Sequence, residues 1–176
     1  MDSCVRSLTR ALVGIVAVGF AASTAWAGVA DPVPMINGTE RAKALYLVPG
    51  VTADLDDLGT TITCTSLEKL KDQIVAVEVF NEDPGTVIND ITLGDGVVGT
   101  VSPGETVNVE ITSDTGGILA VNADVIIDVG TLLHGSARVV STGRKLMCTA
   151  SIMDTENNPP TSAWQINLIV KKQKGD

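Results

Sequence analysis

The sequence predicts an all-β fold, an antiparallel two-sheet sandwich of immunoglobulin-like architecture, preceded by a signal peptide. Apolar and polar residues alternate along most of the chain, which is typical of strands with one buried face. Gly- and Pro-containing turn signals recur about every 8 to 17 residues, a spacing that suits a sandwich of about eight to ten short strands. The sequence leaves open the order of the strands in the sheets.

Residues 1–27 are predicted to form the signal peptide. Arg6 and Arg10 precede the apolar run ALVGIVAVGFAA, and Ala25 and Ala27 form a small-x-small cleavage pattern. We expect cleavage after Ala27 and export to the periplasm or the extracellular space, with no integral membrane segment left afterwards. The alternative is an uncleaved anchor, because residues 11–30 carry no charge.

The rest of the chain is predicted to be one domain. Residues 28–43 form an extended lead-in that contains Pro32, Pro34 and Gly38. Residues 44–172 form the β-sandwich, and residues 173–176 form a short tail.

Three segments show the alternation most clearly: 106–112, 121–129 and 164–171. In each of them we expect the apolar residues to face the core. The segment SLEKLKDQ at 66–73 is the one helix candidate, and it is expected to form at most a single turn.

The cysteines are expected to form one disulfide. Cys4 should leave with the signal peptide, so Cys64 and Cys148 remain as partners for each other in an oxidising compartment. Both occupy the apolar side of an alternating pattern and should point into the core. A catalytic Cys148 is the alternative, but it would need a nearby base and an exposed, electropositive setting.

Composition limits the choice of partners. The chain has a formal net charge of −9 at pH 7. This acidity disfavours nucleic acid and anionic membrane surfaces as partners. A protein partner of unknown identity remains compatible with the sequence.

The sequence offers few residues for catalysis. His134 is the single histidine, which excludes sites built from several imidazoles, and we interpret it as a turn or strand-edge residue. Motifs of the types G-x-S-x-G, H-E-x-x-H and C-x-x-C do not occur. We therefore predict no catalytic residue and a protein that is not an enzyme.

Asp54, Asp56 and Asp57 are the candidate ligands for a metal. They fall in one short loop, ADLDDLG, and clustered carboxylates suit Ca²⁺. The EF-hand template fails, because Leu58 and Thr65 occupy two of its ligand positions. The default interpretation is solvated loop charge with no cofactor, as it is for the acidic turn at 89–95, and Ca²⁺ binding is the alternative.

Aromatic residues are scarce, which argues against a sugar-binding surface. After cleavage only Tyr46, Phe80 and Trp164 would remain, and sugar sites rely on exposed aromatic side chains. Phe80 and Trp164 both occur in predicted strands, so we expect both in the core.

The segments CTSLEKLKDQIVAVEVFNEDPG, VSPGETVNV, HGSARVVSTGRKLMCTASIMD and NPPTS together resemble an uncharacterised group of small exported bacterial proteins with two cysteines. The resemblance covers most of residues 44–170. It implies the sandwich and a structural role for the cysteine pair, and it implies no activity and no functional residue.

Two functions of different class follow from these observations. The first is a non-catalytic exported module, structural or protein-binding, which accounts for nearly every residue as strand or turn. The alternative is a calcium-binding or carboxylate-dependent exported enzyme that uses the acidic loop.

Overall fold

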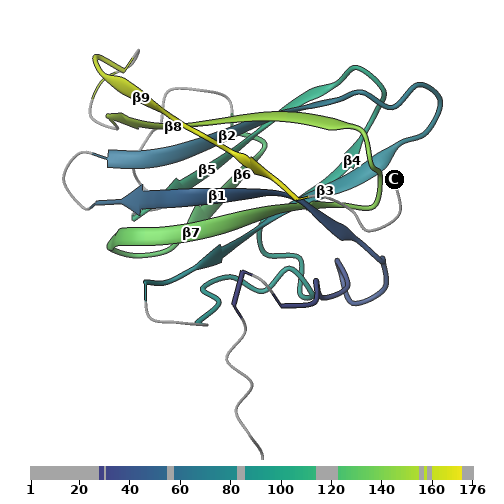
Figure 1. Cartoon of the computed structure of the whole chain (residues 1–176), viewed down its shortest axis with the longest axis horizontal. Coiled ribbons are helices and arrows are strands. Elements are labelled where there is room, and N and C mark those ends of the chain that lie inside the picture. Colours follow the sequence, from purple (N-terminus) through teal and green to yellow (C-terminus); the bar gives the residue numbers. More distant parts are fainter. Residues whose placement is uncertain are drawn as a thin grey trace, which may run out of the picture.

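The computed structural model describes residues 28–29, 31–54, 58–82, 86–113, 123–154, 157 and 160–171. These residues form ten strands and no helix (Figure 1). The strands are β1 (Lys43–Ala53), β2 (Leu58–Ser66), β3 (Gln73–Phe80), β4 (Val97–Val101), β5 (Thr106–Thr112), β6 (Val125–Asp128), β7 (Leu132–Ser141), β8 (Leu146–Asp154), β9 (Ala163–Ile166) and β10 (Ile169–Val170).

The strands form two five-stranded sheets, which confirms the two-sheet sandwich. One sheet has the order β10-β1-β7-β3-β4 and the other β6-β5-β2-β8-β9. Neighbouring strands pair antiparallel except β5 and β6, which pair parallel, so the second sheet is mixed rather than purely antiparallel.

The main core lies between the two sheets. Along β5, Val107, Val109 and Ile111 are buried, as the alternation predicts. They meet valines of β3 and β7 from the opposite sheet in one continuous apolar cluster. Burial of these side chains is the largest favourable contribution to the stability of the fold.

The outer face of the β3–β7 sheet is also covered. A second buried cluster there joins Ala76 and Val140 of the sheet to Ile36, from the segment before β1, and to Ile91, from the loop before β4. Burial on both faces explains why β3 reads QIVAVEVF, a nearly continuous apolar run without alternation.

A buried ion pair lies on this same covered face. Glu78 of β3 and Arg138 of β7 are direct register partners, and Arg138 Nε donates to Glu78 Oε2 at 2.6 Å. The guanidinium also donates to the carbonyl of Asp31 at 2.6 Å and lies over the Phe80 ring, 5.2 Å from its centroid. Arg138 therefore ties the segment before β1 to the sheet.

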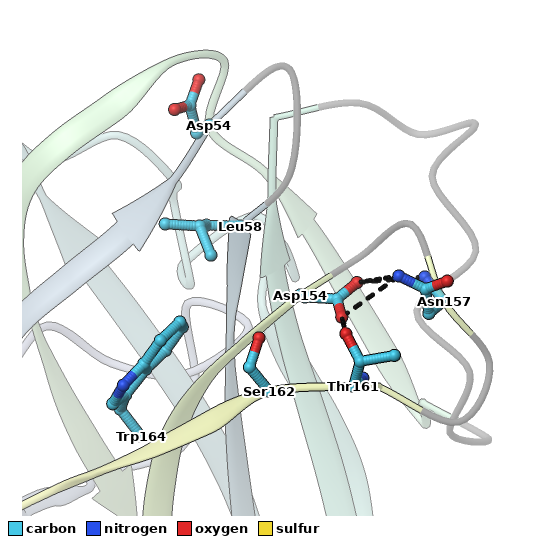
Figure 2. A pocket seen from close by; sticks show the side chains of 7 residues that line it. All are labelled: Asp54, Leu58, Asp154, Asn157, Thr161, Ser162 and Trp164. Atoms are coloured by element: carbon cyan, nitrogen blue, oxygen red, sulfur yellow. Dashed lines mark hydrogen bonds between the residues drawn. The ribbon is translucent and has the colours of Figure 1, made fainter.

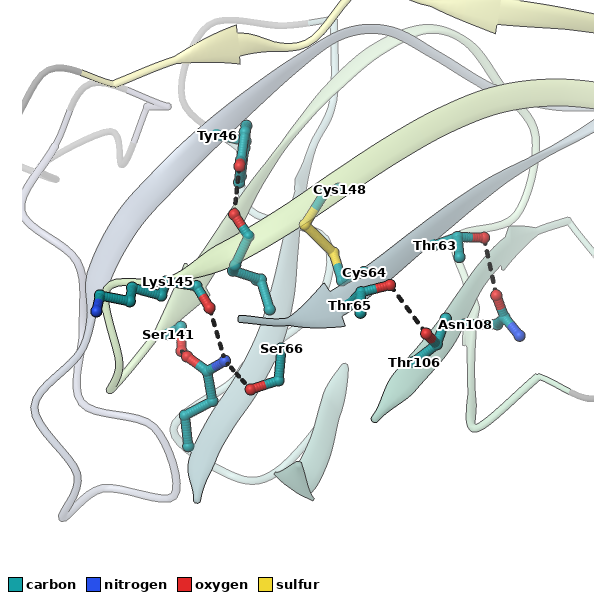
Figure 3. The surroundings of a disulfide bond; sticks show 12 residues. Tyr46, Thr63, Cys64, Thr65, Ser66, Thr106, Asn108, Ser141, Lys145 and Cys148 are labelled. Atoms are coloured by element: carbon teal, nitrogen blue, oxygen red, sulfur yellow. Dashed lines mark hydrogen bonds between the residues drawn. A yellow bond between two sulfur atoms is a disulfide. The ribbon is translucent and has the colours of Figure 1, made fainter. Parts of the chain in front are cut away.

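A disulfide joins Cys64 and Cys148 within one sheet (Figure 3). The two residues are direct partners on β2 and β8, with their Cα atoms 4.1 Å apart. Cys64 is buried and Cys148 is partly buried against the main core, so both lie on the inner side as expected. With its sulfur in the disulfide, Cys148 has no thiolate to act as a nucleophile.

Two predicted strands differ in the structure. The strand expected at 121–129 is limited to β6, and residues 121–122 lie outside the described part of the chain. The strand expected at 164–171 is divided, because β9 pairs with β8 while β10 pairs with β1 of the other sheet. Residues 66–73 form no helical turn, which is within the expected limit of one turn, since that segment ends β2, bends and begins β3.

Removing the disulfide should destabilise the protein. We expect Cys64→Ala with Cys148→Ala to lower the free energy of unfolding by about 2–5 kcal/mol, because two positions separated by 84 in sequence are no longer joined in the unfolded chain. Urea unfolding with and without a reductant measures the effect. The double variant is also the control for the reductant. Because it has no disulfide, the reductant should leave its unfolding midpoint unchanged. An unaltered midpoint for the reduced wild-type protein would contradict the prediction.

Removing one partner of the buried ion pair should lower the free energy of unfolding more than removing both partners. Arg138→Met leaves the Glu78 carboxylate buried without its cation, and we expect a loss of about 3–5 kcal/mol in the free energy of unfolding. Glu78→Leu in the Arg138→Met background should restore part of this loss. The exposed Arg41, replaced by Met, is the matched control. A double variant no more stable than Arg138→Met would count against this account.

Candidate binding pocket

A pocket of about 370 Å³ opens at one end of the sandwich (Figure 2). Its volume is at the lower end of the range for small-molecule sites, about 300–1,000 Å³. The residues come from the position after β1, the start of β2, the end of β8, the segment between β8 and β9, and β9 itself. They are Asp54, Leu58, Asp154, Asn157, Thr161, Ser162 and Trp164.

The pocket forms where the chain passes from one sheet to the other. Asp54 directly follows β1, and Leu58 is the first residue of β2, which belongs to the opposite sheet. The Asp54 N–H donates to the Leu58 carbonyl at 2.8 Å, and the Ser113 hydroxyl donates to the Asp54 carbonyl at 2.7 Å. These bonds fix the backbone of Asp54 at the rim.

Asp154 organises the opposite wall. Its Oδ1 accepts hydrogen bonds from the backbone N–H of Asn157 at 3.0 Å and from the Asn157 amide at 3.1 Å. Its Oδ2 accepts from the backbone N–H of Thr161 at 2.8 Å and from the Thr161 hydroxyl at 2.5 Å. The Asp154 N–H also donates to the Ser162 carbonyl at 3.2 Å. One carboxylate thus holds the segment that carries Ser162 and leads to Trp164.

These hydrogen bonds keep Asp154 ionised. The Thr161 hydroxyl, the Thr161 N–H and the Asn157 donors all stabilise the charged form, so they hold the pKa of Asp154 well below its ordinary value of 3.8. A general acid at neutral pH requires a carboxyl whose pKa is raised. Asp154 is therefore suited to fixing the wall and not to donating a proton.

Trp164 is exposed, and the prediction that it lies in the core is wrong. The register places Trp164 opposite Ile152, but 55% of its surface is accessible. The reason is that β9 is the edge strand of its sheet, so a side chain there has neighbours on one side only. Phe80 is buried as predicted, because β3 lies inside its sheet and both faces of that sheet are covered.

Three polar groups of the pocket make no hydrogen bond to other described parts of the chain. They are the Asp54 carboxylate, the Ser162 hydroxyl and the Trp164 indole N–H. Figure 2 shows Asp54 at one rim and Trp164 at the other, with Leu58 between them. The pocket therefore combines an aromatic ring, an aliphatic side chain and polar groups that a ligand can satisfy.

Other predicted site residues are placed as follows. Of the acidic loop, Asp54 lines the pocket, while Asp56 and Asp57 lie outside the described residues, as do Ala25 and Ala27 of the cleavage pattern.

His134 is exposed near the start of β7. Within the described ranges, no group of three or more His, Cys, Asp or Glu side chains could hold a metal ion. Calcium binding by the acidic loop remains an untested hypothesis.

A second pocket, of about 410 Å³, lies over the buried ion pair and is bordered by Pro32, Glu78, Asn89 and Arg138. Its polar groups bond to the protein itself. Asn89 accepts from the Val79 N–H at 2.7 Å and donates to the Val77 carbonyl at 2.8 Å. The interpretation of 89–95 as solvated loop charge is therefore wrong for Asn89, which is buried and structural. This second pocket therefore has fewer polar groups available to a ligand than the pocket at Trp164.

The hydrogen bonds to Asp154 should make the fold sensitive to acid. A carboxyl whose folded-state pKa is depressed stabilises the fold above the unfolded value of 3.8, and this stabilisation is lost as the pH falls below it. At pH 7 we expect Asp154→Asn to melt at a lower temperature than the wild type. The difference should shrink as the pH falls from 4 to 2, because the wild type then loses the same contribution.

Thermal melts from pH 7 to pH 2 test this expectation. Asp95→Asn is the control, since Asp95 is an exposed carboxylate that makes no side-chain hydrogen bond to the described residues. A difference between Asp154→Asn and wild type that stays constant over the whole range would refute the assignment.

Comparison with known proteins identifies no relative. No family model matches the chain, and no curated protein or solved structure is significantly similar to it. Among the described residues, there is also no helix long and apolar enough to cross a membrane. The resemblance to small exported bacterial proteins therefore remains an expectation from the sequence.

Proposed function

We propose that this chain is an exported, non-catalytic β-sandwich module, cross-linked by one disulfide, that binds a partner at the pocket of Trp164. The observation that carries the proposal is the exposed Trp164 ring beside polar groups that the described protein leaves unbonded. Exposed tryptophans in partly formed pockets are common anchors of binding sites. The disulfide agrees with an oxidising compartment, and so with export.

The chemistry of the pocket supports binding rather than catalysis. Asp54 and Asp154 both line it, which is the one feature that favours a carboxylate-dependent enzyme. Acid–base catalysis by two carboxyl groups requires their pKa values to differ, with one raised enough to donate a proton. The hydrogen bonds to Asp154 move its pKa in the opposite direction. The two sulfur atoms of the disulfide offer no nucleophile either.

Co-sedimentation with cell envelopes tests the proposed binding role. The protein is purified from the exported fraction and mixed with envelopes of the producing cells from which the gene has been deleted. We expect saturable binding, and we expect Trp164→Ala to weaken it at least about tenfold, as loss of an aromatic anchor does. Trp164→Phe should retain most of the binding.

Met147→Ala is the matched control. Met147 is exposed to a similar extent, 54% against 55% for Trp164, but it lies on β8 outside the pocket. Far-ultraviolet circular dichroism checks that each variant is folded. Binding that Met147→Ala and Trp164→Ala weaken equally would reject the pocket as the binding site, and no binding to any envelope fraction would reject a partner in the cell envelope.

A further inference from the structure

The pocket at Trp164 presents an aromatic face together with hydrogen-bonding groups of both kinds. The Asp54 carboxylate only accepts hydrogen bonds, the indole N–H of Trp164 only donates, and the Ser162 hydroxyl does both. Leu58 adds aliphatic surface between the two rims. A ligand that satisfies all of these groups carries an apolar face and has both hydrogen-bond donors and acceptors at its edge.

A saccharide ring has this combination of surfaces. One face of a pyranose exposes C–H groups that pack on an indole ring, while the hydroxyls around its edge donate to carboxylates and accept from N–H groups. A flat apolar ligand would leave Asp54 and Ser162 desolvated without a partner, which costs free energy. A peptide could pack on Trp164, but its amide groups match a carboxylate and a hydroxyl less closely than a ring of hydroxyls does.

Charge narrows the class of saccharide. Asp54 and Asp154 both line the pocket, no Lys or Arg is among its described lining residues, and the whole chain has a net charge of −9. Two carboxylates at close range disfavour an anionic ligand, and the field of the whole chain acts in the same direction. Uronic acids, sulfated sugars and phosphorylated sugars are therefore disfavoured relative to uncharged ones.

The pocket wall is also fixed before any ligand arrives. Asp154 receives hydrogen bonds from Thr161 and donates its own N–H to the Ser162 carbonyl, so the residues that precede Trp164 are held in place. A fixed wall reduces the entropy lost on binding. The rim at Asp54 is held by its bonds to Leu58 and Ser113.

We propose that this pocket binds an uncharged saccharide, with one sugar ring stacked on Trp164 and its hydroxyls bonded to Asp54 and Ser162. The proposal rests on the proposed binding function and names its ligand class. It also reverses the expectation from the sequence that sugar binding is disfavoured, because Trp164 is exposed and does not lie in the core.

A glycan array that carries both neutral and anionic oligosaccharides is the first test, followed by titration with the best neutral glycan. Fluorescence is read on the exported protein, in which cleavage after Ala27 is expected to leave Trp164 as the one tryptophan. We expect binding confined to neutral glycans, with a change in Trp164 emission. Trp164→Ala has no indole to report binding, so it is compared with wild type on the array, where its binding should be weaker by at least about tenfold, as it is when a stacking aromatic is removed from a nucleic-acid site.

The other variants separate stacking from hydrogen bonding. Trp164→Phe should bind within a few-fold of wild type, and Asp54→Asn should bind several-fold more weakly because an amide accepts hydrogen bonds less strongly than a carboxylate. Met147→Ala should bind like wild type. Equal binding by wild type and Trp164→Ala would overturn the proposal, and so would salt-sensitive binding restricted to anionic glycans.

This test also separates the ligand class from the binding function. Trp164-dependent binding to envelopes with no neutral glycan bound on the array would reject the saccharide and leave the binding module intact. Glycan binding without any binding to envelopes would support the saccharide and reject the envelope as its source.

Discussion

The burial of one face of each sheet against the other is the constraint on which the rest of this structure depends. The valines and isoleucines of β3, β5 and β7 can leave water only if the two sheets face each other. The chain must then cross between the sheets, as it does from β1 to β2 and from β9 to β10. At such corners the strand pairing ends and the backbone needs other partners. The pocket at Trp164 lies at one of these corners, so the site is a consequence of how the sandwich closes.

Buried or fully bonded polar groups in this protein have a structural role. Glu78 and Arg138 neutralise each other beneath the segment before β1, and Arg138 also binds a carbonyl of that segment. Asp154 is satisfied by Thr161 and Asn157 and thereby fixes the loop that leads into β9. Such arrangements stabilise one conformation but leave little capacity to bind a ligand. At the open end of the sandwich, by contrast, Asp54, Ser162 and Trp164 keep polar groups that no described residue bonds.

Local patterns were sufficient for much of the fold. The alternation of Val107, Val109 and Ile111 predicts β5 because a strand has a period of two residues. The positions of Cys64 and Cys148 on the apolar side of their segments predicted an inward disulfide, which the structure contains. The pairing of Glu78 with Arg138 gave no such signal, because the residues are far apart in sequence and depend on the register of β3 with β7.

By itself, the sequence determined the all-β class, the position of several strands and the two cysteines available for a disulfide, because these depend on periodicity and composition. Only the tertiary structure decided which strand lies at an edge. Because β9 is an edge strand, Trp164 is exposed and not in the core as expected. Alternation gives the direction of a side chain but not the neighbours that cover it. It also brought Asp54 and Trp164, which are far apart in sequence, to the same pocket. The candidate site depends on strand order and on the crossing between sheets, which no local pattern encodes.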